Sequence, residues 1–316
     1  MKILILGAGG FLGTNLTIEY SNHNCNEVYA FDLKEEYLYN VKRNCQNRVT
    51  YLSGDFSFNT NIDDLVKNID IVYHLISTSI PATSNSSIEK DLNDNVIMTA
   101  KLLDACVRQN VEKVIFISSG GAVYGKEANV PLKEDAPTNP ISSYGIQKIT
   151  IEKLLYLYDY LYDLDYRIIR LANPYGPYQR PNGKLGVVTT FIDDAIKDKT
   201  LTVYGNGEVI RDFIYVDDAI KAILNIVEGT GREKTGQVHK TFNVGSGIGK
   251  SVNSVIEDIK QIFNKPLDIE YIDGRKADVP VNYLDISLYE RIYGKLINNS
   301  FEEGVKKTKE FLEKNK

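Results

Sequence analysis

KILILGAGGFLG, at residues 2–13, opens the chain with a short apolar run that leads directly into glycines. The run is rich in Ile and Leu, which is typical of a strand buried on both faces of a parallel sheet. Gly7 permits a tight turn, Gly10 lets the backbone approach a ligand closely, and Gly13 lets a helix pack against the strand. A polar–apolar helical pattern follows, so the opening predicts a strand, a turn and a helix.

An acidic residue follows the next predicted strand. Glu27–Phe31 (EVYAF) ends at Asp32, about twenty residues after the glycines. A helix N-terminus beside glycines binds a pyrophosphate, and a carboxylate at this position bonds the ribose hydroxyls of NAD but repels the 2′-phosphate of NADP. The order of these features predicts an NAD site, with a purely structural glycine turn as the alternative. The residues predicted to contact the cofactor are Gly7, Gly10, Phe11, Leu12, Gly13 and Asp32.

A tyrosine and a lysine further along the chain fit chemistry beside such a cofactor. Tyr144 and Lys148 stand four residues apart in YGIQK, a spacing that places both on one face of a helix. A nearby cation stabilises a phenolate, so Tyr144 can serve as a base. The same spacing arises by chance on many exposed helices, and the prediction therefore depends on the cofactor site.

The composition narrows the class of protein. The chain has 316 residues, of which 43% are hydrophobic and 25% charged, and a net charge of −5, so we expect no nucleic-acid partner. No apolar stretch approaches a membrane span, and the N-terminal run is too short for a signal peptide. Three scattered cysteines (Cys25, Cys45, Cys106) favour a reducing cytoplasm, and no spacing of His and Cys predicts a metal site.

Strands and helices alternate through the first half of the chain. This alternation predicts an α/β fold of the Rossmann type, a doubly wound parallel sheet, in residues 1–172. Shorter elements in 173–316 predict a smaller α/β lobe for the substrate, and segments near 205–245 are candidates to return to the first domain. The candidate strands of the sheet are Lys2–Leu6, Glu27–Phe31, Val49–Leu52, Ile71–Leu75, Lys113–Ser118 and Tyr166–Leu171. The two long helices between the later strands are expected over Ser87–Gln109 and Ser142–Leu161.

These motifs resemble those of the extended short-chain dehydrogenase/reductase superfamily, and within it nucleotide-sugar epimerases of the UDP-glucose 4-epimerase type. The resemblance covers nearly the whole chain. Its carriers are GAGGFLG at 7–13, SSGGAVYG at 118–125, YGIQK at 144–148, NPYGP at 173–177, VYGNGEVIRDFIYVDD at 203–218 and GRKADVP at 274–280.

The resemblance implies roles for further residues near the cofactor. Tyr144 matches the catalytic tyrosine, and Lys148 matches the lysine that bonds the nicotinamide ribose. Asp55 resembles an acid that faces the adenine, with a turn residue as the alternative. Asn95 resembles an asparagine with a structural role near the active site.

One departure concerns the hydroxyl that would bond the sugar O4. Relatives carry Ser or Thr at the positions that are Gly120 and Ala122 here. We therefore expect this hydroxyl, a third catalytic group, to come from Ser119, with Ser118 or water as alternatives.

The resemblance also implies residues for the nucleotide sugar. Arg211 and Arg275 resemble phosphate-binding arginines, with surface ion pairs as the alternative. Asn173 resembles a nucleotide-site asparagine, and Tyr204 an aromatic residue that stacks on uracil or else packs in the core. Asn282 stands where relatives flank the sugar C2 substituent, unless Tyr283 fills that space.

The implied activity is NAD-dependent C4 epimerisation of a UDP-sugar through a 4-keto intermediate. The substrate is UDP-glucose and UDP-galactose, with the N-acetylated pair also open. Alternatives are a UDP-glucuronate epimerase, a decarboxylase, a dehydratase or a non-catalytic NAD-binding sensor. The family analogy further predicts a homodimer through Ser87–Gln109 and Ser142–Leu161.

Overall fold

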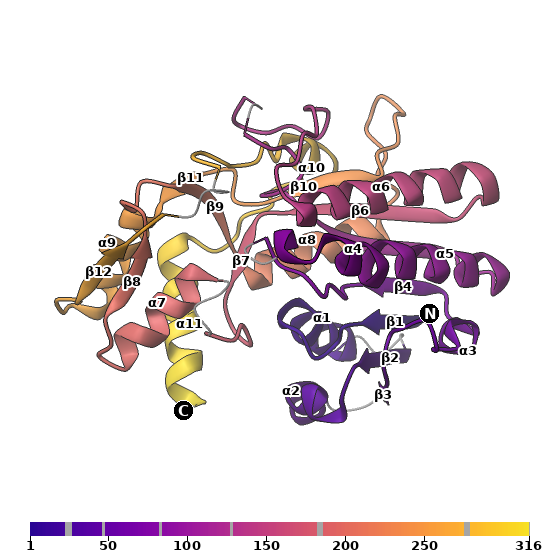
Figure 1. The fold of residues 1–316 in the computed structure, drawn as a ribbon, viewed down its shortest axis with the longest axis horizontal. Helices are drawn as coiled ribbons and strands as arrows, with labels where there is room; N and C mark the ends of the chain where they lie inside the picture. The colour runs from indigo at the N-terminus through magenta and orange to yellow at the C-terminus, as the bar shows by residue number, and fades with distance from the viewer. Residues whose placement is uncertain are drawn as a thin grey trace. The chain divides into compact units, whose positions relative to one another are not determined.

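The computed structural model of the protein describes residues 1–22, 27–45, 48–81, 84–126, 129–181, 186–274 and 279–315. The chain divides into two compact units, and each unit is built from separate segments (Figure 1). The first unit comprises Met1–Val123 and Ser142–Ile169, and the second comprises Tyr124–Ile141 and Arg170–Lys316. A domain boundary at residue 172 stays a prediction.

The first unit contains a parallel sheet in which six strands have the order β6-β5-β4-β1-β2-β3. Ile3 of β1 pairs with Val28 on one side and with Ile71 on the other, so the strand order reverses at β1. This is the order of a doubly wound Rossmann sheet, in which ligands bind where the order reverses, beyond the carboxyl ends of the strands. The strands are β1 (Lys2–Leu6), β2 (Glu27–Asp32), β3 (Val49–Ser53), β4 (Ile71–His74), β5 (Lys113–Ser119) and β6 (Asp165–Leu171).

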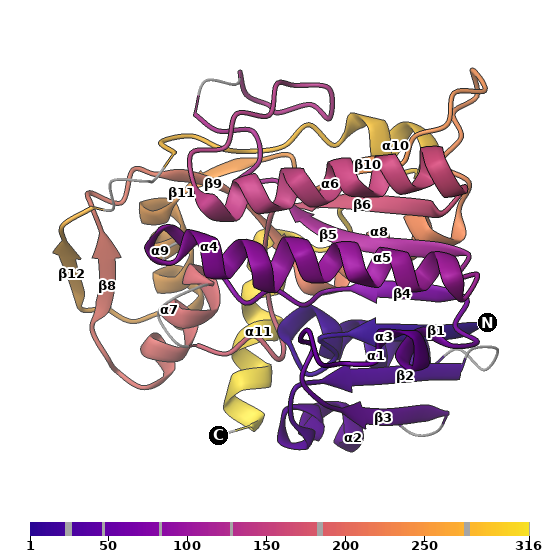
Figure 2. The ribbon, with the colours of Figure 1, turned by 45° about the vertical axis from the view of Figure 1, so that its right-hand side comes forward.

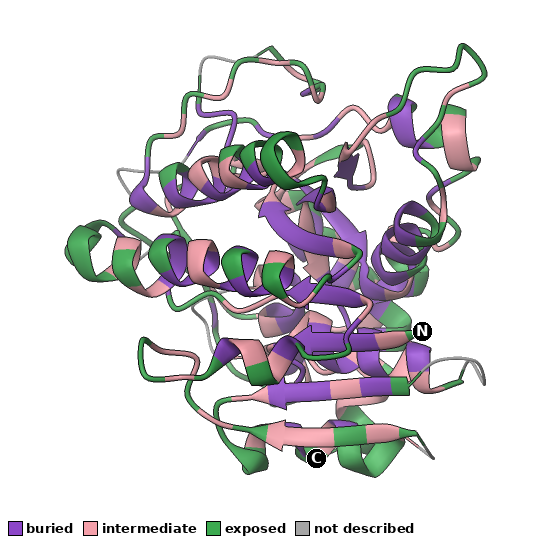
Figure 3. Cartoon of the chain, turned by 90° about the vertical axis from the view of Figure 1, so that its right-hand side faces the viewer, coloured by how far each residue is buried: buried purple, intermediate pink, exposed green. Residues whose placement is uncertain are grey.

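Both faces of this sheet are covered, as the apolar strands predict. Val72 of β4 belongs to a buried cluster with side chains of α3, α5 and α6, whereas the next residue, Tyr73, bonds Tyr20 of α1 at 2.5 Å. Successive strand residues point to opposite faces, so α1 lies on the face opposite to α5 and α6. Figure 2 shows α5 and α6 side by side, and Figure 3 shows that the inner strands are buried. The helices named here are α1 (Phe11–Asn22), α3 (Ile62–Val66), α5 (Met98–Arg108) and α6 (Ser143–Tyr162). The unit also contains the short helical segments η1 (Glu35–Leu38), α2 (Tyr39–Asn44) and η2 (Ser84–Ser86).

The single helix expected over Ser87–Gln109 is interrupted. It consists of α4 (Ile88–Asp91), a π-helical turn η3 (Leu92–Ile97) and α5. Within the turn, Asn95 Nδ2 donates to the carbonyl of Asp91 at 2.9 Å. A polar side chain that bonds the backbone of the preceding turn competes with regular helix geometry, and π turns are common at functional sites.

The second unit contains shorter elements. Its three-stranded sheet has the order β11-β9-β7, and a parallel pair joins β8 and β12. Strand β10 runs beside the end of β6 that belongs to this unit, where the Ala172 N–H donates to Val244 O at 2.8 Å. The strands are β7 (Asn173–Tyr175), β8 (Leu201–Tyr204), β9 (Ile210–Tyr215), β10 (Thr241–Val244), β11 (Gly249–Ser251) and β12 (Ile269–Ile272). The helices are α7 (Val187–Ile196), α8 (Val216–Glu228), α9 (Val252–Phe263), α10 (Ser287–Tyr293) and α11 (Phe301–Lys314).

No helix in the described parts of the chain is long and apolar enough to cross a membrane. Among the described residues, no group of three or more His, Cys, Asp or Glu could hold a metal ion.

Candidate active site

The glycine turn lies at the carboxyl end of β1. Gly7 has a φ of 87°, a conformation that glycine adopts without strain. The N–H groups of Gly7 and Ala8 both donate to Phe31 O, at 2.9 and 3.0 Å, so the turn is tied to the end of β2. The Gly10 N–H then donates back to Gly7 O at 3.1 Å and starts the entry into α1.

Two of the glycines are required by close packing. A Cβ at Gly13 would lie 2.1 Å from Gly7 O, and a Cβ at Gly9 would lie 2.3 Å from Tyr37 O. At Gly10 the nearest atom to a Cβ would be Gly7 O at 3.2 Å, so this position is less crowded by the protein itself. The first turn of α1 therefore rests directly on the loop at the carboxyl end of β1.

Asp32 is held beside this loop. Its Oδ2 accepts from the Gly9 N–H and its Oδ1 from the Leu33 N–H, each at 2.8 Å. The side chain is half-buried, and a carboxylate has further lone pairs for ribose hydroxyls. Asp55 is exposed two residues after β3, and its neighbour Gly54 donates its N–H to Asp32 O at 3.0 Å. The structure thus places the two acids predicted for the adenosine at neighbouring strand ends.

The predicted catalytic side chains meet where α6 begins beside the end of β5. Ser142 caps α6 by accepting from the Gly145 N–H at 3.2 Å, and the first turn of α6 carries Tyr144. The Ser119 side chain lies close enough to the Tyr144 hydroxyl to affect its pKa. Lys148 Nζ donates to Ile117 O at 2.8 Å and lies 5.5 Å from the centre of the Tyr144 ring.

Burial shifts the two titrating groups in opposite directions. Burial raises the pKa of Tyr144 to about 12, and the nearby Ser119 side chain opposes this rise. Burial lowers the pKa of Lys148 to about 8, and the charge of Glu152 opposes this fall. Without a ligand Tyr144 is therefore a phenol at neutral pH. An added positive charge nearby would favour its phenolate.

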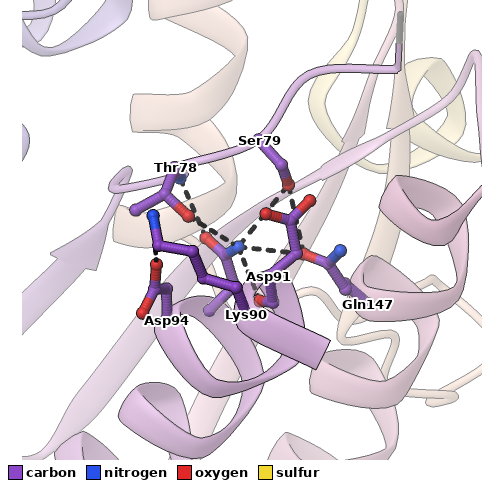
Figure 4. Close-up of polar contacts among 7 residues, drawn as sticks. Thr78, Ser79, Lys90, Asp91, Asp94 and Gln147 are labelled. Carbon is purple, nitrogen blue, oxygen red and sulfur yellow. Dashed lines mark hydrogen bonds and ion pairs between the residues drawn. The ribbon is translucent and has the colours of Figure 1, made fainter. Parts of the chain in front are cut away.

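An amide network that the sequence did not predict holds the segment after β4. Asn95 Nδ2 donates to Thr78 Oγ1 at 2.9 Å and to Gln147 Oε1 at 3.0 Å, and Asn95 Oδ1 accepts from the Thr78 N–H at 2.9 Å. Ser79 Oγ also donates to Gln147 Oε1, at 3.2 Å, and Figure 4 shows Thr78, Ser79 and Gln147 turned toward one another. The network fixes the residue before Lys148, which agrees with the structural role expected for Asn95. A signal was present, because Thr78 and Ser79 follow β4 at the ligand-binding edge of the sheet.

Of the residues predicted for the nucleotide sugar, Asn173, Tyr204, Arg211 and Asn282 lie in the described part of the second unit, and three of them gather along β9. Asn173 Nδ2 donates to Asp212 O at 2.9 Å. Arg211 Nη1 donates to Ile210 O at 2.8 Å, and the buried Asn282 donates its N–H to the same carbonyl at 3.1 Å. The structure therefore brings Asn173, Arg211 and Asn282 together. Tyr204, at the end of β8, is 41% exposed, and Arg275 lies outside the described residues.

Comparisons with known proteins identify relatives over the full length. A model of the NAD dependent epimerase/dehydratase family matches residues 3–245. UDP-glucose 4-epimerase from Thermotoga maritima, solved with UDP-glucose, is 30% identical to this chain, with a TM-score of 0.90. The match covers 100% of this chain and 99% of the Thermotoga chain. UDP-glucuronic acid 4-epimerase from Bacillus cereus, solved with UDP-glucuronic acid and NAD, is 26% identical with a TM-score of 0.90 and covers 100% of both chains. UDP-N-acetylglucosamine 4-epimerase from Methanobrevibacter ruminantium is 28% identical, also with a TM-score of 0.90, and covers 100% of this chain and 99% of its own.

Proposed function

The chain belongs to the NAD dependent epimerase/dehydratase family, and from this premise we propose that it interconverts the C4 epimers of a UDP-sugar with NAD as its resident cofactor. The observation that carries this function is the contact of Tyr144 with Ser119 beside Lys148, at the sheet edge where the glycine turn also lies. A sensor that only binds NAD does not need a base and a cation in this arrangement.

The residues of the first unit fit NAD. The tight packing of Gly13 on Gly7 brings the N-terminus of α1 to the loop, where its N–H groups would bind the pyrophosphate. Asp32 would bond the adenosine ribose, and its negative charge favours NAD over NADP. Asp55 would face the adenine, and Lys148 would bond the nicotinamide ribose.

Tyr144 and Ser119 would perform the proton transfer. NAD, when bound, supplies a reversible acceptor for the hydride of the sugar C4. Tyr144 as phenolate would remove the proton from the C4 hydroxyl. It would return the proton after the 4-keto sugar has rotated in the site and presents its opposite face. Lys148 stabilises the phenolate by its charge. The Ser119 hydroxyl would bond the sugar O4, since Gly120 has no side chain to do so.

Residues 120–122 favour epimerisation over the other reactions of this fold. The family resemblance implies that dehydratases and decarboxylases of this fold carry acids just after the strand-end hydroxyl, whereas this chain has Gly120, Gly121 and Ala122. No acid is available there to remove water from C5 and C6 of the sugar. A simple exchange at C4 is the reaction that the remaining groups support.

The side chains of the second unit would select the sugar. Arg211 and Arg275 would bind the diphosphate, while Asn173 and Tyr204 would hold the uridine. Asn282 is smaller than tyrosine, so the pocket would admit an N-acetyl group at C2. We therefore infer that UDP-glucose and UDP-N-acetylglucosamine are both substrates.

A panel of sugars tests this function. The purified protein is incubated with UDP-glucose, UDP-N-acetylglucosamine and UDP-glucuronate, and the C4 epimers are resolved by NMR. We expect turnover of the first two without consumption of NAD. Tight NAD binding with no turnover of any sugar would instead favour the sensor, and turnover of UDP-glucuronate alone would favour the uronate epimerase.

We also propose a homodimer through the outer sides of the η3–α5 segment and α6. Large apolar side chains are exposed on these elements, among them Tyr156 at 61%, Tyr160 at 77% and Ile97 at 43%. Apolar surface of this kind on neighbouring helices is typical of a protein interface. Light scattering at micromolar concentration should give the mass of a dimer, and a monomer would reject the proposal.

A further inference from the structure

A buried carboxylate lies behind the catalytic pair, and the mechanism above does not use it. Glu152 is 5% exposed and stands one helical turn after Lys148 on α6. Ser118 Oγ donates to Glu152 Oε1 at 2.6 Å, a short hydrogen bond to a charged acceptor. A carboxylate is costly to bury unless it is hydrogen-bonded or near a cation, so its presence here calls for a reason.

Three successive residues of β5 contact three residues of α6 that are spaced by four. The Ile117 carbonyl accepts from Lys148 Nζ, Ser118 Oγ donates to Glu152, and the Ser119 side chain lies beside the Tyr144 hydroxyl. Residues 144, 148 and 152 lie on one face of the helix because of this spacing. The end of β5 therefore fixes the base, the cation and the carboxylate in one row.

We propose that Glu152 keeps Lys148 protonated over the working pH range of the enzyme and that Ser118 holds the carboxylate in place for this task. The proposal rests on the proposed function, since it assigns a role within the same site. Glu152 acts through Lys148 and does not touch the substrate, so it is a positioning residue.

The charges around Lys148 support this assignment. Burial lowers the pKa of Lys148 to about 8, and the Glu152 carboxylate raises it. His74 of β4 also faces Lys148, but burial lowers its pKa to about 3, so it is neutral. Burial raises the pKa of Tyr144 on the same helix and of Tyr166 on β6 to about 12 each, so both are neutral phenols. Glu152 is thus the group in this set whose charge raises the pKa of Lys148.

The other elements packed against α6 contact its first turns through hydroxyl and amide groups. From η2, the Ser84 hydroxyl accepts from the Tyr144 N–H, and from η3 the Asn95 amide bonds Gln147. From α5, Asp104 accepts from the Tyr158 hydroxyl at 2.5 Å, ten residues beyond Lys148. These contacts hold the helix without supplying a charge at its first turns.

Removal of the Glu152 charge should lower the pKa of Lys148. Without the carboxylate, burial alone acts on Lys148, and its pKa falls below about 8. Lys148 would then lose its proton at a lower pH and no longer stabilise the Tyr144 phenolate in mildly alkaline solution. Two unit charges one helical turn apart interact strongly enough to move the midpoint by at least about one pH unit.

The direct test is a titration of Lys148 by NMR in protein labelled at the lysine ε-carbon, with the resonance assigned from Lys148→Arg. We expect Glu152→Gln to lower the Lys148 midpoint by at least about one pH unit, and Glu152→Asp to restore part of the loss. The matched control is Glu112→Gln, which removes one carboxylate from an exposed position before β5 and should leave the midpoint unchanged. A wild-type midpoint in Glu152→Gln would overturn the proposal.

The pH profile of epimerisation gives a second readout. The alkaline limb of kcat/KM should move with the Lys148 midpoint, so Glu152→Gln should lose about tenfold at pH 8.5 and much less at pH 6.5. A loss of equal size at every pH would indicate a merely structural role and would overturn the proposal. The NMR titration needs no sugar turnover, so a failure of the proposed function and a failure of this inference can be told apart.

A further variant keeps the test decisive if Glu152→Gln does not fold. Ser118→Ala leaves the carboxylate in place but removes the hydroxyl that fixes it. We then expect a smaller downward shift of the Lys148 midpoint in the same titration. An unchanged midpoint in Ser118→Ala would count against the assignment.

Discussion

Replacing Gly13 by alanine should damage both the stability and the NAD affinity of the protein. The added Cβ would lie 2.1 Å from Gly7 O and 2.7 Å from Ala8 Cα, whereas ordinary contacts lie at 3.4–4 Å. Both atoms belong to the backbone, so no side chain can move aside. The first turn of α1 must therefore move away from the loop by more than about 1 Å.

The magnitude follows from two opposing contributions. Overpacking costs about 1–3 kcal/mol, and a clash with backbone belongs in the upper half of that range. Alanine in place of glycine within a helix returns about 1 kcal/mol. The net loss is about 1–2 kcal/mol, which lowers Tm by about 2–8 °C. The displaced helix N-terminus should also weaken NAD binding at least about tenfold, which corresponds to about 1.4 kcal/mol.

The assay pairs Gly13→Ala with Gly10→Ala in calorimetry and in NAD titration of nucleotide-free protein. A Cβ at Gly10 would meet its nearest atom at 3.2 Å, so Gly10→Ala should keep its stability within about 0.5 kcal/mol. Its affinity for NAD should nevertheless fall, because the Cβ would occupy the space through which the backbone approaches the pyrophosphate. A Gly13→Ala protein with wild-type Tm and NAD affinity would refute the packing argument, and wild-type NAD affinity in Gly10→Ala would refute the assignment of the loop.

Three further predictions follow from the proposed site. Tyr144→Phe should keep NAD bound and lower epimerisation by about 10²–10⁴, since the base is lost and the fold is not; normal turnover in a kinetic assay would contradict the mechanism. Asp32→Ala should relax the preference for NAD over NADP in equilibrium titration, and a wild type that prefers NADP would reject the assignment. Asn282→Tyr should abolish activity on UDP-N-acetylglucosamine alone, as judged by kcat/KM for the two sugars, whereas a wild type inert toward the N-acetyl sugar would end the idea of a dual substrate.

The sheet of the first unit could be predicted because each of its strands has a local sequence signal. Each strand of the first unit is an apolar run between turn residues, and the alternation with helices leaves few topologies. The strands of the second unit that surround Arg211 were not predicted, because β7 and β11 have three residues each and show no periodicity. The extended short-chain dehydrogenase/reductase assignment is confirmed by the family match and by the similarity to solved UDP-sugar epimerases.

Side-chain partners that are distant in sequence were beyond prediction. Asn95 interrupts its helix while bonding Thr78 and Gln147, which are 17 and 52 residues away. Ser118 and Ser119 are adjacent and chemically identical, so the sequence left Ser118 as an alternative to Ser119 for the catalytic hydroxyl and predicted no contact with Glu152. The geometry at the end of β5 separates them, with Ser118 on Glu152 and Ser119 on Tyr144.

The path of the chain through its two units limits how such a protein can be divided or recombined. The polypeptide passes from one unit to the other after Val123, after Ile141 and after Ile169. No single cut yields either unit intact, and a fragment ending near residue 172 would keep residues 124–141 without the rest of their unit. A graft that joined a foreign second unit to the end of the first would leave residues 124–141 of the original second unit in place. Exchange of a whole unit between relatives must respect three junctions at once, so we expect such proteins to diverge by point substitutions within each unit.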